Sequence, residues 1–138
     1  MRAHLVLKND GGIEFQAKGD SGHQITVGFP EDAGGKDSGP TPMELLLYGA
    51  AGCTGIDIVK ILEKMKAEVL EFEILIDGQR AEKHPRRFEI IEIEYIIKGK
   101  GLSEKNVRRA IELSQEKYCS ATNSLNAEIR YSYQYENI

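Results

Sequence analysis

Residues 41–66 read TPMELLLYGAAGCTGIDIVKILEKMK, and this stretch decides the fold that the rest of the chain has to complete. Thr41 can cap a helix, Pro42 suits its first turn, and Glu44 stands where a capping box needs an acidic residue. The second half of the stretch is amphipathic, whereas Leu45–Ile56 is uncharged and apolar on all sides. Because such a helix is buried on every side, we expect a long central helix covered by a sheet, by another helix and by a second copy of the chain.

Apolar residues that alternate with polar ones predict strands on both sides of this helix. A second amphipathic helix is expected after Ser103, and a slip in the alternation at Ile90–Ile91 suggests a β-bulge. This order of elements predicts a single α+β domain over residues 1–138 with mostly antiparallel pairing. The expected strands are 3–7, 13–17 and 23–29 before the central helix, and 70–76, 88–97 and 129–135 after it.

Composition excludes several classes of protein. The chain has 138 residues, of which 41% are hydrophobic and 29% charged, and this mixture is typical of a globular domain. The net charge of −4 and the lack of a basic stripe argue against a nucleic-acid partner. No signal peptide is expected, because MRAHLVLKND at the N-terminus lacks an apolar run, and no membrane span is expected, because the longest uncharged run, Leu45–Ile56, is too short. We therefore expect a cytoplasmic protein, in which Cys53 and Cys119 do not form a permanent structural disulfide.

Cys53 lies among three glycines, Gly49, Gly52 and Gly55, inside a stretch that otherwise reads as a helix. Glycine costs a helix interior about 0.5–1 kcal/mol relative to alanine. Two explanations stay open: a neighbour packs very closely there, or the thiol has to be reachable. A cysteine in such a chain is most often a small buried hydrophobe.

Other chemistry has weaker support in the sequence. No metal site is predicted, because Cys-x-x-Cys is absent and His4, His23 and His84 show no ligand spacing. A nucleophilic cysteine with His84 as its base is a possible alternative.

Two segments resemble the OsmC/Ohr family, which comprises osmotically inducible protein C and organic hydroperoxide resistance proteins. They are SGPTPMELLLYGAAGC at 38–53 and AIELSQEKYCSATNSL at 110–125, and the order of strands and helices agrees over the whole chain. The resemblance implies an intertwined α+β homodimer with its active sites at the interface. It also implies a thiol peroxidase in which Cys53 attacks an organic hydroperoxide and Cys119 resolves the product as a disulfide. An external dithiol would then reduce the enzyme, and no organic cofactor is needed.

The resemblance leaves the activating cation undecided. The acidic residue of the family matches Glu44, but its arginine in the N-terminal strand region has no counterpart, since no arginine lies between Arg2 and Arg80. We favour Arg80, with Arg2 and Lys36 as alternatives. Glu44 lies nine residues before Cys53, or about 13.5 Å along an unbroken helix, so a long arginine would have to bridge them. The segment YCSATNSL also lacks the proline that is common after the second cysteine, which indicates a less characterised branch.

Two further classes of function compete with a peroxidase. The first alternative is a dimeric module that binds a small lipophilic ligand in an interface pocket, with cysteines that are incidental. The second is a purely structural or interaction protein. The reactivity of Cys53 separates the peroxidase from both alternatives.

Overall fold

The computed structural model describes all residues, Met1–Ile138. The chain divides into two compact units, Met1–Leu46 and Leu47–Ile138. The boundary between them falls inside the first turns of the long helix α1 (Pro42–Lys64). Each unit is described by itself below.

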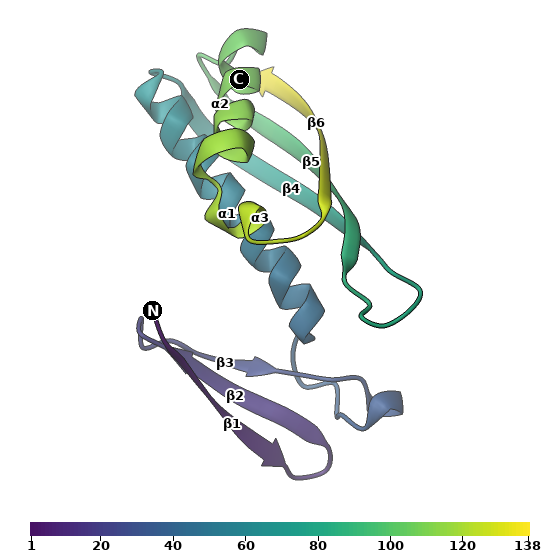
Figure 1. The fold of residues 1–138 in the computed structure, drawn as a ribbon. Coiled ribbons are helices and arrows are strands. Elements are labelled where there is room, and N and C mark those ends of the chain that lie inside the picture. Colours follow the sequence, from purple (N-terminus) through teal and green to yellow (C-terminus); the bar gives the residue numbers. More distant parts are fainter. The chain divides into compact units, whose positions relative to one another are not determined.

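The first unit is a three-stranded antiparallel sheet in the order β1-β2-β3 (Figure 1). Its strands are β1 (Ala3–Asn9), β2 (Ile13–Gly19) and β3 (Gln24–Val27). The β1–β2 turn places Gly11 and Gly12 at positive φ, a conformation that glycine adopts without strain. β3 is shorter than the predicted strand 23–29, because the chain beyond it bonds to its own loop: the amide of Gly28 donates to the Pro40 carbonyl. A short 3₁₀ helix, η1 (Glu31–Ala33), lies within that loop.

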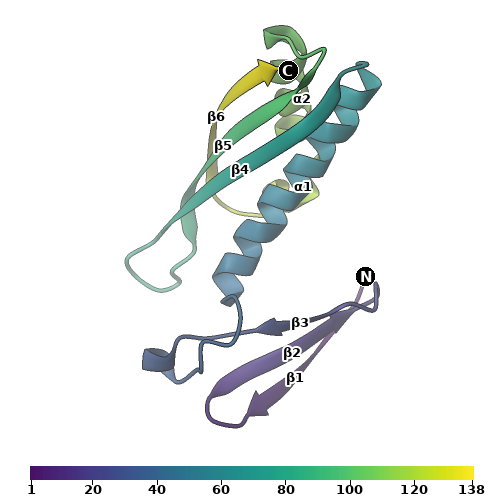
Figure 2. The same cartoon turned by 180° about the vertical axis from the view of Figure 1, so that it is seen from behind.

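The second unit is a sheet in the order β4-β5-β6 with helices on one face, as the two opposite views show (Figures 1 and 2). The strands are β4 (Glu68–Arg80), β5 (Phe88–Lys100) and β6 (Glu128–Asn137). β4 and β5 are antiparallel, which agrees with the prediction, whereas β5 and β6 are parallel. The parallel pair needs a long crossover. That crossover consists of α2 (Glu104–Leu113), the π-helix η2 (Ser114–Tyr118) and the short α3 (Ser120–Asn123).

The predicted β-bulge is present, one residue earlier than expected. Gln79 pairs with Ile90, whereas the next residue, Arg80, pairs with Phe88. Glu89 is therefore the extra residue on β5, and it shifts the buried face of the strand from Phe88 to Ile91.

The capping box that starts α1 is formed as the sequence indicates. The backbone amide and the hydroxyl of Thr41 donate to Oε1 of Glu44 at 3.2 and 3.1 Å, and the Glu44 amide donates to the Thr41 hydroxyl at 3.2 Å. α2 begins with a second capping box, in which Ser103 is paired with Asn106. Both helix starts are thus set by local side chains.

Within one chain, α1 is buried along one face, and the expected cover of its other sides by a second copy stays a prediction. Its buried residues are Ala50, Thr54, Gly55, Ile58 and Leu62. On its other sides, Leu46, Tyr48 and Ile56 are 43%, 55% and 63% exposed. One chain therefore supplies cover for only part of the apolar helix.

By length and composition alone, α1 could cross a membrane, since a window of it reaches a mean hydropathy of 1.6. The sequence led us to expect no membrane span because the uncharged run Leu45–Ile56 covers only 12 residues of α1. However, α1 also carries Asp57 and Lys60, and its buried face packs against the helices and the sheet of the second unit. The core helix of a globular fold passes the same test.

The core of the second unit lies between the sheet and the helices. Its largest fully buried side chain is Tyr95 of β5. Around it lie aliphatic side chains from the sheet and from both helices: Ile91, Ile93 and Ile97 of β5, Ile58 and Leu62 of α1, and Val107 and Ile111 of α2.

Candidate active site

The second unit brings Cys53 and Cys119 together, although 119 − 53 = 66 residues separate them in the chain. The two Sγ atoms and a carboxylate oxygen of Asp57 all lie within 4.8 Å of one another. Cys53, on α1, is half-buried, and Cys119, just after η2, is 1% exposed. Both thiols are free, so the structure describes the reduced form of the pair.

The π-helix η2 positions Cys119. The amide of Cys119 donates to the Ser114 carbonyl at 2.7 Å, which closes the widened turn. Such π-turns are frequent at functional sites. Cys119 then caps α3, and its Sγ accepts a hydrogen bond from the Thr122 amide at 3.4 Å. Tyr118, the last residue of this turn, is exposed.

A network of buried polar side chains lies next to the thiols. The Thr54 hydroxyl is 2.9 Å from Tyr95 OH and 2.8 Å from the Ser114 hydroxyl. Nε2 of Gln115 donates to Tyr95 OH at 2.8 Å and to Thr54 at 3.2 Å. Ser114 in turn donates to Oδ2 of Asp57 at 3.1 Å. The network ties α1, β5 and η2 together directly behind the two cysteines.

The environment keeps the Cys119 thiol protonated. Burial raises the pKa of Cys119, and the neighbouring Cys53 raises it further, whereas hydrogen bonds from Thr122 oppose the shift. Burial also raises the pKa of Tyr95, which therefore remains a neutral hydrogen-bonding group. Because the thiolate is the reactive form of cysteine, Cys119 needs help to become a nucleophile.

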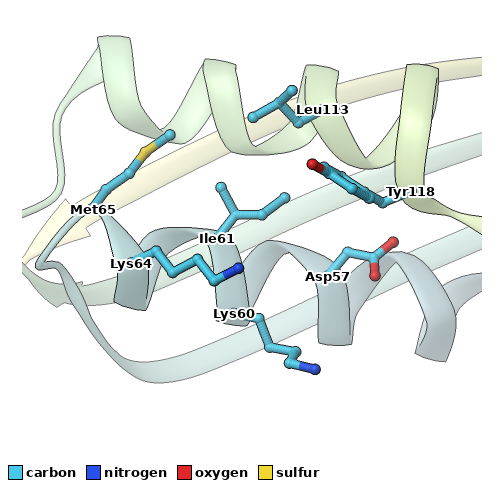
Figure 3. A pocket seen from close by; sticks show the side chains of 7 residues that line it. All are labelled: Asp57, Lys60, Ile61, Lys64, Met65, Leu113 and Tyr118. Atoms are coloured by element: carbon cyan, nitrogen blue, oxygen red, sulfur yellow. The ribbon is translucent and has the colours of Figure 1, made fainter.

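A cavity of about 370 Å³ opens beside the thiols, between α1 and the α2–η2 segment (Figure 3). Ile61, Met65 and Leu113 supply apolar walls, while Lys60 and Lys64 supply positive charge. Tyr118 and Asp57 also line the cavity. Asp57 lines the cavity and also belongs to the 4.8 Å cluster with both cysteines, so this residue links the cavity to the thiol pair.

The other predicted site residues have well-defined local contacts. Glu44 takes part in the capping box of α1, and α1 is unbroken between it and Cys53. Nε of Arg80, at the end of β4, donates to the Arg86 carbonyl at 2.9 Å. In the first unit, Nζ of Lys36 donates to the Asp10 carbonyl at 3.0 Å, and the Arg2 amide donates to Asp20. These contacts do not test an ion pair between Arg80 and Glu44, which stays a prediction.

Asp57 is the site residue that sequence reasoning missed. Its signal was its position four residues after Cys53, since positions i and i+4 lie on the same face of a helix. Cysteine and aspartate can also bind metal ions, and this group offers three ligands, fewer than the four of a structural zinc site. We interpret the cluster as a thiol centre because its two cysteines belong to distant segments that the fold brings together.

Comparison with known proteins agrees with this geometry. The family model described as OsmC-like protein matches residues 35–134, which include both cysteines and most of the fold. The chain belongs to the OsmC family. The resemblance seen in the two cysteine segments is thereby confirmed, together with the α+β class of the fold.

Individual members of the OsmC family resemble the whole chain. Protein YhfA of Escherichia coli K12 is 38% identical over 125 residues, which are 91% of this chain and 90% of YhfA. The crystal structure of a hypothetical protein from Aquifex aeolicus VF5 is 35% identical, with a TM-score of 0.77 and coverage of 98% and 96%. An organic hydroperoxide resistance protein from Legionella pneumophila shares the fold, with a TM-score of 0.67, 14% identity and coverage of 97% of each chain.

The glycines around Cys53 in this OsmC-family chain are not equivalent. A Cβ atom added to Gly55 would lie 2.8 Å from Cδ1 of Ile74 on β4, so close packing explains this glycine. Gly49 and Gly52 have no atom within 4 Å of an added Cβ. Within one chain these two glycines therefore leave the surface of α1 open next to Cys53.

Proposed function

We propose that this protein is a cysteine-based thiol peroxidase that reduces organic hydroperoxides. The observation that carries the proposal is the approach of the Cys53 and Cys119 sulfur atoms to within 4.8 Å in a reduced chain. A resolving cysteine has to lie near its partner, because the two sulfur atoms of a disulfide are only about 2.05 Å apart. The difference in burial supports the assignment of roles, since the more accessible Cys53 can meet a substrate first.

The cycle has three balanced steps. The Cys53 thiolate attacks the terminal oxygen of the hydroperoxide, the O–O bond breaks, and the alkoxide leaves as an alcohol once it is protonated. The product is a sulfenic acid on Cys53. Cys119 sulfur then attacks Cys53 sulfur, which forms the disulfide and expels water. An external dithiol reduces the disulfide and is itself oxidised.

The cavity beside the thiols supports an organic rather than an inorganic hydroperoxide. Its volume of about 370 Å³ suits a small organic molecule, and its apolar walls favour a hydrocarbon body. The fold relative from Legionella pneumophila is described as an organic hydroperoxide resistance protein. We also propose that the protein is cytoplasmic and that it has neither a nucleic-acid nor a membrane partner.

Activation of Cys53 requires a nearby positive charge, because the thiolate is the attacking form. We keep Arg80 as the residue that supplies it, held by Glu44 through a charge-assisted contact. Arg2 and Lys36 are the alternatives. Arg80→Ala should then slow the alkylation of Cys53 at neutral pH, and unchanged alkylation would direct attention to Lys36 or Arg2.

The working form is proposed to be an intertwined homodimer with one domain per chain. The support is the exposed apolar surface of α1, on which Leu46, Tyr48 and Ile56 project from one chain. A groove along the same helix has mostly apolar walls, and Lys60 and Glu63 also line it. Its apolar residues are Ala51, Gly52, Gly55, Ile56 and Val59 of α1, with Phe72 and Ile74 of β4. A second copy of α1 would bury this surface.

The deciding experiment measures consumption of cumene hydroperoxide in the presence of a small dithiol. We expect turnover by the wild type, none by Cys53→Ser, and accumulation of a sulfenic acid in Cys119→Ser. A wild type without turnover would contradict the proposal. The cavity also favours a second candidate, a binding module for a lipophilic ligand. In that case Cys53→Ser would retain a co-purifying ligand and the wild type would show no peroxidase activity.

A further inference from the structure

Asp57 has a defined place at the thiol centre. One of its carboxylate oxygens lies within 4.8 Å of both Sγ atoms, and the residue projects from the same face of α1 as Cys53. Figure 3 shows the carboxylate at the end of the cavity, across from Tyr118. A proton acceptor at this separation can reach a thiol by a small side-chain rotation or through one water molecule.

Ser114 fixes both Asp57 and Cys119. Its hydroxyl donates to Oδ2 of Asp57 at 3.1 Å, and its carbonyl accepts the amide of Cys119 at 2.7 Å. Ser114 itself is fully buried. The carboxylate and the second cysteine are therefore held by one residue, so their proximity is built into the π-turn.

The hydrogen atoms of the network have only one consistent arrangement with an ionised Asp57. A carboxylate only accepts hydrogen bonds, so Ser114 must donate its single hydroxyl hydrogen to Asp57. Thr54 must then donate to Ser114, and Tyr95 must donate to Thr54. Gln115, with its amide NH₂ group, donates to both Tyr95 and Thr54. Every hydrogen bond of this network is thus donated in the direction of Asp57, and hydrogen bonds connected in this way polarise one another.

Cys119 is the group that needs an acceptor. Its thiol is buried, its pKa is raised by that burial, and the neutral thiol is a poor nucleophile. The disulfide step also needs a proton at a second place, because the oxygen that leaves the Cys53 sulfenic acid must depart as water. A single residue close to both sulfur atoms can accept the proton of Cys119 and supply a proton to the leaving oxygen.

We propose that Asp57 carries the proton of Cys119 to the oxygen that leaves Cys53 when the disulfide forms. The Asp57 carboxylate takes the S–H proton as Cys119 sulfur attacks Cys53 sulfur. The S–S bond forms, the S–O bond of the sulfenic acid breaks, and the departing hydroxide takes the proton from Asp57 to become water. Neither a metal ion nor another reactant is needed. This inference rests on the proposed peroxidase function for its natural reaction.

Other titratable groups surround the pair. Lys60 and Lys64 on α1 and Tyr118 on η2 line the cavity that Asp57 faces, and Tyr95 of β5 lies behind Thr54. The ammonium group of a lysine has no acceptor atom, and burial raises the pKa of Tyr95, so that its phenol stays neutral. Asp57 is thus the carboxylate that shares the 4.8 Å cluster with both thiols.

The test separates the two chemical steps in single turnover with one equivalent of cumene hydroperoxide. A 1,3-diketone traps the sulfenic acid on Cys53, and mass spectrometry follows the disulfide. In Asp57→Asn we expect the first step not to be slowed, because the substitution removes a negative charge next to Cys53. Disulfide formation should slow by about 100-fold. In Asp57→Asn the rate of disulfide formation should depend on the thiolate of Cys119, so below the Cys119 pKa it should rise by about tenfold per pH unit. This rise with pH should be steeper than in the wild type.

Glu63→Gln is the matched control, since it removes one carboxylate from the exposed side of the same helix. It should match the wild type in both steps. Asp57→Asn that forms the disulfide at the wild-type rate, or that slows both steps equally, would overturn the inference. A wild type that never forms a sulfenic acid would instead contradict the proposed function.

A second measurement does not depend on peroxide. Dithiobis(nitrobenzoate) modifies Cys53 with release of one thionitrobenzoate, and attack by Cys119 on that mixed disulfide releases a second one. In Asp57→Asn the second phase should be slower than in the wild type and in Glu63→Gln, while the first phase is not slowed. Equal second phases in all three proteins would rule out Asp57 as the acceptor of the Cys119 proton.

Discussion

The two sheets of this protein have similar sequence patterns but different surroundings. In β1 every residue is exposed, including Leu5, Val6 and Leu7. In β5 alternate residues are buried, and Ile93, Tyr95 and Ile97 are among the most enclosed side chains of the chain. The difference shows that alternation predicts a strand but not what will cover it, because β5 has helices on one face and β1 lacks comparable cover.

Size gives a physical reason for the contrast. A unit of 46 residues buries too small a fraction of its surface to form a stable core by itself, whereas the 92 residues of the second unit are enough for one. The first unit is therefore the part of the chain that should depend most on the proposed assembly. The predictions below test this contrast, in order of decreasing expected effect.

The largest effect is expected in the core of the second unit, between its sheet and its helices. Ile58 of α1 is fully buried, and Ile58→Ala should lower the free energy of unfolding by about 2–5 kcal/mol through lost burial and a cavity. Denaturant unfolding measures the change. Leu5→Ala, at a half-exposed position of β1, is the comparison and should cost clearly less under conditions where the protein is a monomer. Equal losses would show that β1 has a core that one chain does not reveal.

The next effect concerns assembly. Ile56 is 63% exposed on α1, and Ile56→Glu would place a charge on the apolar surface that we propose a second copy covers. We expect the wild type to be a dimer at micromolar concentration and Ile56→Glu to shift it toward monomer, as measured by light scattering. Glu82→Gln, in the exposed β4–β5 loop, should leave the dimer intact. A stable wild-type monomer would contradict the proposed homodimer.

A smaller effect is expected in the reactivity of the two thiols. Because burial raises its pKa and restricts access, Cys119 should be alkylated more slowly than Cys53 at neutral pH. A raised pKa means less thiolate at any given pH, so modification of Cys119 should become appreciable only as the pH increases. Peptide mapping of the reduced protein over time and pH provides the measurement. Faster labelling of Cys119 would reverse the proposed order of the cysteines.

The smallest effect is expected at Gly52, where a substitution should stabilise the isolated chain but weaken the dimer. Gly52 has open space where a Cβ would be, so Gly52→Ala should stabilise an isolated chain by about 0.5–1 kcal/mol. In the dimer the added methyl group should interfere with close packing and weaken association. The measurement combines unfolding of an Ile56→Glu background with light scattering of the single variant. An increase in stability in both settings would place Gly52 outside the interface.

Local signals explain what the sequence determined by itself. The start of α1 follows from Thr41 and Glu44, and the alternating strands follow from their period of two; both depend on residues a few positions apart. The surroundings of the two cysteines identified the family before any geometry was known. The bulge in β5 was also visible, to within one residue, as a break in alternation.

The tertiary structure decided the features that join distant parts of the chain. Sequence did not predict the parallel pairing of β6, the π-turn at Ser114–Tyr118 or the place of Asp57 at the thiol centre. Periodicity records only which face of an element is apolar, so it cannot register a single widened turn or bring Cys119 to Cys53 across 66 residues. That approach depends on the packing of α2 and η2 against α1, and the hydrogen bonds that join Ser114 to Thr54 and to Asp57 hold it in place.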